Sequence, residues 1–162
     1  MKLYTLTSTQ HLPISREEAW AFFSDPRQLA GVTPEDISFE MIDEMPEPLH
    51  AGMILRYRIR PFPLMQVQWV TEITHVSEGK RFVDEQRFGP FRFWLHNHRF
   101  TEIEGGVEMQ DTVYYAMPFS FIGRITHQLI VRKRLEEIFS FRKKQLQAYF
   151  GQMSSSRTAD HQ

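Results

Sequence analysis

The hydrophobic period of the chain changes once, and this change constrains the fold more than any other feature of the sequence. Up to Met117, apolar and polar residues alternate in short runs that are separated by turn residues, which indicates β-strands. After Pro118 the apolar residues recur every 3.6 positions, and Gly151 follows the last of them as a C-terminal cap. The sequence therefore predicts a sheet followed by one C-terminal helix of roughly 28 residues, long enough to cross a whole sheet.

Seven segments fit the strand pattern, and most of them are joined by hairpin turns such as 78–80 and 104–106. The clearest is 53–60, whose arginines at every second position predict a solvated outer face. An antiparallel meander follows from this order. The predicted strands are 2–10, 37–45, 53–60, 66–76, 81–88, 91–103 and 107–117.

Short helices are predicted between the first two strands. Ser15 and Glu18 have the S-x-x-E spacing of a capping box, in which each residue hydrogen-bonds the backbone N–H of the other. Pro26 stops this helix or restarts it as a second one, and 31–34 ends the helical stretch.

A chain of 162 residues has the usual size of one domain, and we expect that domain to span 1–151, with a polar tail at 152–162. Hydrophobic residues make up 41% of the chain and aromatic residues 14%, which is enough for a packed core with aromatic surface to spare. One helix cannot fill the concave side of seven twisted strands, so the remaining space has to be packed or occupied. The expected fold is therefore α+β: a curved seven-stranded antiparallel sheet, two short helices and a long C-terminal helix around a cavity.

Composition excludes several classes of partner and chemistry. The formal net charge is -1, from 19 basic and 20 acidic residues, which gives no global field that would attract nucleic acid. Cysteine is absent, so disulfides, thiolate nucleophiles and Cys-based zinc sites are excluded. We find no signal-peptide pattern and no apolar run of about 18 residues, and therefore expect a cytoplasmic protein without membrane insertion.

A family resemblance rests on two runs of residues together with the order of elements. The sequence resembles the ligand-binding SRPBCC superfamily (START-related, birch-pollen-allergen-like), and within it a bacterial subgroup similar to polyketide cyclases and dehydrases. This resemblance covers most of the chain up to Gly151 and implies a helix-grip fold with a deep apolar cavity. It does not imply one reaction, because the superfamily mixes carriers and enzymes. The runs are Phe82-x-Asp84-x-Gln86-x-x-Gly89-Pro90-Phe91-x-x-Trp94-x-His96-x-His98-x-Phe100 and Asp111-x-Val113-x-Tyr115-x-x-Pro118.

Polar and aromatic residues share one face of the strand 91–103, because residues two apart project to the same side. Trp94, His96 and His98 lie on this face, and Asp84 and Gln86 share a face of the preceding strand. The opposite face of 91–103 is as apolar as this one, so alternation alone does not say which side lines the cavity. The candidate ligand-binding residues are Asp84, Gln86, Trp94, His96, His98, Asp111 and Tyr115.

Two other interpretations of these residues stay open. In the first, Asp84 and Gln86 pair with a histidine only to steady a hairpin, while Tyr115 belongs to the core and Asp111 is exposed. In the second, His96 and His98 are two ligands of a metal ion, but the sequence fixes no third ligand, so we expect no metal and no cofactor.

Two predictions concern the C-terminal part. The basic run 132–134 is expected to be solvated and balanced by the neighbouring glutamates 136 and 137. Pro118 and Gly123 are expected to bound a mobile gate.

The sequence thus predicts a module that binds a small hydrophobic or amphipathic molecule in an internal cavity. The alternatives are a cyclase or dehydratase that uses His96 or His98 as general base, and an adaptor with a filled core. The residues decide neither whether a reaction is catalysed nor whether the chain forms a homodimer.

Overall fold

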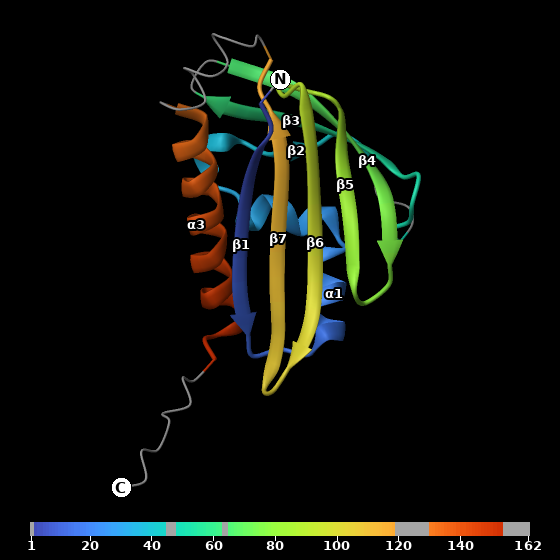
Figure 1. The fold of residues 1–162 in the computed structure, drawn as a ribbon, viewed down its shortest axis with the longest axis vertical. Helices are drawn as coiled ribbons and strands as arrows, with labels where there is room; N and C mark the ends of the chain where they lie inside the picture. Colours follow the sequence, from blue (N-terminus) through green and yellow to red (C-terminus); the bar gives the residue numbers. More distant parts are fainter. Residues whose placement is uncertain (1, 45–47, 63–64, 119–129, 154–162) are drawn as a thin grey trace, which may run out of the picture.

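A computed structural model describes residues 2–44, 48–62, 65–118 and 130–153. Its seven strands form one sheet in the order β1-β7-β6-β5-β4-β3-β2, with every neighbouring pair antiparallel. Figure 1 shows the last helix, α3 (Arg132–Phe150), lying beside β1, while α1 (Arg16–Phe23) lies behind β6 and β7. The predicted fold class is confirmed. The strands are β1 (Tyr4–Leu12), β2 (Glu40–Met41), β3 (Ile54–Phe62), β4 (Met65–Ser77), β5 (Arg81–Phe88), β6 (Phe93–Ile103) and β7 (Gly106–Ala116).

The helix α1 begins where the capping box predicts. The Glu18 backbone N–H donates to Ser15 Oγ at 3.1 Å, and the Ser15 backbone N–H donates to Glu18 Oε2 at 2.9 Å. Asp25 then caps a 3-10 helix, η1 (Pro26–Val32), by accepting the Arg27 backbone N–H. The restart at Pro26 is thus confirmed.

The strand predicted over 37–45 is wrong for most of its length. Ile37 belongs to a second 3-10 helix, η2 (Glu35–Ile37), and Ser38 adopts a left-handed backbone with φ of 45°, which turns the chain before pairing begins. The strand β2 comprises only two residues, which pair with β3, and the Ile42 backbone N–H donates to the Arg56 carbonyl of β3 just beyond it. Alternation of apolar residues does not reveal such a turn, because Ser38 carries no special sequence signal.

The predicted C-terminal helix is confirmed over α3, which comprises 19 residues. Gly151 caps it with φ of 90° and donates its backbone N–H to the Gln147 carbonyl. The expected start of the helix near Ile125 lies outside the described residues, as do positions 119–123 of the expected gate. Within the described part of the chain, no helix combines the length and the apolar character that a membrane crossing needs.

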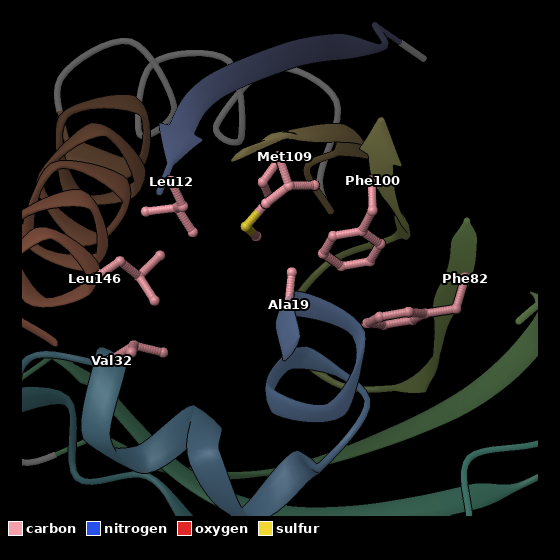
Figure 2. Packing of buried hydrophobic residues seen from close by; sticks show 8 residues of the cluster. Leu12, Ala19, Val32, Phe82, Phe100, Met109 and Leu146 are labelled. Atoms are coloured by element: carbon pink, nitrogen blue, oxygen red, sulfur yellow. The ribbon is translucent and has the colours of Figure 1, made fainter. Parts of the chain in front are cut away.

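Packing divides the interior into a filled end and a hollow end. At the filled end, α1 inserts Ala19 between the sheet and α3, against Met109, Phe100 and Leu146 (Figure 2). At the other end, two clusters of apolar side chains line a space that α3 does not fill. One surrounds Trp94 and Phe139, and the other covers the inner face of β3 around Tyr57.

The turn between β6 and β7 generates a stability prediction. A Cβ at Gly106 would overlap the Leu12 backbone carbonyl, which cannot move away without breaking the β1–β7 pairing. We expect Gly106→Ala to lower the free energy of unfolding by about 1–3 kcal/mol, as overpacking does elsewhere. Gly31→Ala is the control, because no atom lies within 4 Å of its Cβ position. Urea unfolding of both variants checks this; equal stabilities would contradict it.

Candidate functional site

A cavity of about 790 Å³ occupies the hollow end of the fold, between the inner face of the sheet and α3. Its walls are mostly apolar and aromatic: Trp69 and Trp94 meet edge to face with ring centroids 5.2 Å apart, and Phe91 packs on both. Tyr57 also lines it, and burial, assisted by the negative charge of Asp84, raises the pKa of its phenol, so the hydroxyl stays protonated.

The strand β6 turns its histidine face inward, which settles the question that alternation leaves open. Trp94, His96 and His98 are each at most 9% exposed, and all three line the cavity. Pairing with the two neighbouring strands places a carboxylate on either side of the histidines: Asp84 of β5 lies opposite His96, and Asp111 of β7 lies opposite His98.

Two histidines and two aspartates therefore form one buried cluster. His96 Nε2 lies 3.0 Å from Asp111 Oδ1, and His98 Nε2 lies 2.9 Å from Asp84 Oδ2. The remaining nitrogens are close as well: His98 Nδ1 is 2.9 Å from Asp111 Oδ1, an ionic contact whose direction falls short of a hydrogen bond, and His96 Nδ1 is 3.6 Å from Asp84 Oδ2. Asp84 pairs with both histidines.

Aromatic rings fix the orientation of both imidazoles. The ring of His98 stacks on Phe82 with centroids 4.1 Å apart, and His96 meets Phe139 of α3 edge to face at 5.8 Å. The two imidazoles are themselves 3.7 Å apart. Such packing holds the cluster in one arrangement, because neither ring can rotate without displacing an aromatic neighbour.

Burial and the contacts within the cluster shift the pKa values of Asp111, His96 and His98 in different directions. Burial alone would raise the pKa of Asp111, but its contacts with His96 and His98 outweigh burial and hold that pKa below the ordinary value. Burial lowers the pKa of His96, and the charge of His98 lowers it further. For His98, burial is again the largest single effect and acts to lower the pKa, but the contacts with Asp111 and Asp84 together outweigh it and raise the pKa. The surroundings therefore favour the charged form of His98 more than that of His96.

The other candidate residues lie outside the cavity lining. Asp111 is 4% exposed and sits behind the histidines rather than at the surface, in contrast to the interpretation that leaves it exposed. Gln86 binds no histidine: its side-chain amide donates to the Phe91 carbonyl at 2.6 Å and closes the β5–β6 turn. Tyr115 is 2% exposed and packs against Tyr4 and Trp94 in the core.

Two arginines of α3 line the cavity and were not expected there. Arg134 was predicted to be solvated, but its side chain is only 19% exposed and donates to Asp36 at 2.7 Å and to the Pro61 carbonyl at 3.3 Å. Arg142 is 8% exposed, and its guanidinium lies over the Phe139 ring, 5.2 Å from the centroid. The spacing of the apolar stripe contains a signal for Arg142, because this residue occupies a stripe position, three residues after Phe139 and four before Leu146.

Three groups of the cluster could hold a metal ion. Asp84, His96 and His98 each offer one donor atom, and the three atoms lie within 4.8 Å of one another. The sequence lacks a fixed third ligand because Asp84 belongs to a different strand, and only the β5–β6 register brings it to the histidine pair.

Comparisons with known proteins identify the fold. No family model matches the chain, and no curated protein matches it. Among solved structures, protein CV1439 from Chromobacterium violaceum is 14% identical with a TM-score of 0.70, over 92% of this chain and 98% of that one. The ginseng major latex-like protein 151 from Panax ginseng is 10% identical with a TM-score of 0.67, over 91% and 97%. Ara h 8.0201 is 12% identical with a TM-score of 0.62, over 91% and 99%. The chain thus has a helix-grip fold similar to that of birch-pollen-allergen-like proteins.

The buried cluster generates a prediction about stability and pH. Asp111→Asn removes the charge that both histidines face, and we expect a loss of about 3 kcal/mol or more, as for other broken buried pairs. The stabilisation by Asp111 is present above the ordinary carboxyl pKa of 3.8 and is lost as the pH falls through its depressed folded value. The part that arises from the raised pKa of His98 is present below the ordinary imidazole value of 6.5 and is lost as the pH rises through the folded value.

The stability gap between the wild type and Asp111→Asn should therefore be largest between pH 3.8 and 6.5. Urea unfolding over a pH series measures it. Glu40→Gln is the control, because Glu40 and Arg58 form an exposed pair, which contributes at most about 1 kcal/mol. A gap that is small, or flat across the pH series, would show that the cluster does not act as a unit.

Proposed function

We propose that the protein binds a small amphipathic molecule, with an apolar body and one anionic group, in the cavity between the sheet and α3. The observation that carries this proposal is Arg142, a buried arginine that lines an apolar cavity and has no anionic partner among the described residues. The resemblance of the sequence to ligand-binding SRPBCC proteins supports the same class of function.

The cavity has the size and the walls of a small-molecule site. Sites that bury most of a drug-sized ligand measure roughly 300–1,000 Å³ and combine apolar walls with a few polar groups, and this cavity of about 790 Å³ falls in that range. Aromatic rings such as Trp69 and Phe91 offer flat surfaces for the ligand body, and His96, His98 and Asp84 add polar groups on the sheet side.

The surroundings of Arg142 support an anionic group in the ligand. Its Nε is buried without a hydrogen-bond partner, and among the described residues it takes part in no ion pair. Arg134, on the same helix and the same cavity, shows the usual solution, since Asp36 and Glu137 neutralise it. An unpaired buried charge costs several kcal/mol, and the guanidinium presents donors that match a carboxylate, sulfate or phosphate. A ligand anion would remove this cost.

The position of Asp84 supports one orientation of the ligand. Asp84 lies on the sheet side, where it would repel an anion, whereas Arg142 lies on α3. We therefore place the anionic end of the ligand at the helix and neutral polar or apolar groups at the sheet. In this arrangement Trp94, His96, His98 and Asp84 contact the ligand directly, while Asp111, Gln86 and Tyr115 act by holding these residues in place.

The first test is the thermal shift produced by matched pairs of ligands, each an aliphatic or polycyclic carboxylic acid and the alcohol with the same skeleton. We expect acids to stabilise the wild type more than alcohols, because hydrogen bonds to charged groups contribute about 1.5–3 kcal/mol, or roughly ten- to hundredfold in affinity. Arg142→Gln should remove this preference while retaining weaker binding of both. Arg132→Gln is the control on the same helix, with a side chain that is 68% exposed.

Native mass spectrometry of the purified protein, followed by extraction under denaturing conditions, identifies any molecule that copurifies. A stoichiometric acidic lipid or polycyclic acid would support the proposal. A protein of bare mass that gains no thermal stability from any pair of ligands would overturn it and favour an adaptor. An acid preference that persists in Arg142→Gln would refute the role of Arg142 alone.

A further inference from the structure

We propose that Asp84, His96 and His98 form a binding site for one divalent transition-metal ion on the sheet wall of the cavity. The geometry of the donor atoms, the position of a second carboxylate behind them and the charge of the cluster each support this site. The site does not involve Arg142, although its three donor residues belong to the same cavity as the proposed ligand.

The spacing of the donor atoms is close to that of a coordination shell. Ligands about 2.0–2.2 Å from an ion lie roughly 3.0–3.5 Å from one another in octahedral or tetrahedral geometry. Asp84 Oδ2 is 2.9 Å from His98 Nε2 and 3.6 Å from His96 Nδ1. One donor atom of each of the three residues lies within 4.8 Å of the other two, so a modest convergence of these side chains would bring all three around one ion. Two imidazoles and one carboxylate are also a recognised donor set for divalent transition metals.

Asp111 occupies the position of an orienting carboxylate. In metal sites, the ring nitrogen that does not bind the metal commonly donates to a carboxylate, which fixes the tautomer and the ring plane. Asp111 Oδ1 forms a 3.0 Å hydrogen bond with His96 Nε2 and lies 2.9 Å from His98 Nδ1, so one buried oxygen is next to the outer nitrogen of both rings. The other nitrogen of each ring, His96 Nδ1 and His98 Nε2, faces Asp84. Two histidines that merely steadied a hairpin would not need this shared arrangement.

Charge balance favours a divalent ion. Asp84 and Asp111 contribute two negative charges, and their side chains are only 16% and 5% exposed. A proton held by the histidine pair neutralises one of them, whereas a divalent cation between neutral imidazoles neutralises both. The contact of His98 Nε2 with Asp84 needs a proton or a metal ion between the two atoms, because a deprotonated nitrogen and a carboxylate oxygen repel each other at 2.9 Å. The metal ion would take the place of this proton.

The site would keep open coordination positions toward the cavity. All three donor residues line the cavity, whereas Asp111 does not, so solvent or a polar group of a ligand could complete the shell. Three protein ligands with an open position distinguish a reactive or ligand-binding centre from a closed structural one. Because the donors are imidazole and carboxylate without thiolate, we expect zinc, iron(II), cobalt(II) or manganese(II) rather than copper(I).

The test is metal binding by the untagged protein after treatment with a chelator. Isothermal titration with zinc(II), and visible absorption on addition of cobalt(II), should show one ion per chain with nitrogen and oxygen ligands. Asp84→Asn and His96→Gln should each weaken binding by at least tenfold, and Asp111→Asn should weaken it about 10–100-fold, the range for residues that orient metal ligands. His75→Gln is the matched control, because His75 is exposed and contacts Arg81.

Circular dichroism establishes that each variant folds, and the wild-type titration decides the question even if a variant does not. A wild type that binds neither metal ion stoichiometrically would overturn the site. Binding that His75→Gln weakens as much as His96→Gln would also overturn it, because the ion would then sit on surface histidines. Ligand binding measured after chelator treatment separates this proposal from the previous one, since binding of the organic acid depends on Arg142 and does not require the metal.

Discussion

The register of β5, β6 and β7 is the constraint on which the site depends. The backbone hydrogen bonds between these three antiparallel strands place Asp84 of β5 opposite His96 of β6, and His98 of β6 opposite Asp111 of β7. A slip of one residue in either pairing would turn the inward side chains outward and leave at least one charge buried without a partner. The aromatic residues that flank the cluster, Phe82 and Trp94, oppose such a slip, because they also lose their burial when the register changes.

The interior is hollow at one end because the helices cover the two ends of the sheet at different distances. The short helix α1 fills the concave side near Phe100 and Met109, where its single buried residue, Ala19, allows close approach. At the other end the sheet curves toward β2 and β3, and the cavity lies between the sheet, α3 and the 3-10 helices η1 and η2. Side chains there reach the cavity without meeting a partner across it, so the volume follows from topology rather than from small residues.

Features that depend on residues close together in the sequence can be predicted from it, whereas contacts between distant segments cannot. Local signals succeed: the capping box of α1, the turn positions and the 3.6-residue period of α3 each arise within a few residues, and the structure confirms them. The strand over 37–45 fails because Ser38 turns the chain by its backbone alone. The composition of the site is also visible in the sequence, but its pairing is not, since His–Asp contacts join three strands. The hydrogen-bond partner of Gln86 was not predictable either, because it is the backbone carbonyl of Phe91 in the adjacent turn and not a side chain.

Arg142 was not among the expected site residues, although its place in the apolar stripe of α3 is visible in the sequence. It occupies a position of the apolar stripe of α3 at which a leucine or methionine would pack without electrostatic cost, so stability alone does not account for it. Arg142 and His96 touch the same ring, Phe139, from α3 and from the sheet. The positive group on the helix and the His–Asp cluster on the sheet are thus held by one aromatic side chain, on opposite walls of a single apolar cavity. This separation of charge, rather than the volume of the cavity, is what would orient a bound molecule and distinguish one end of it from the other.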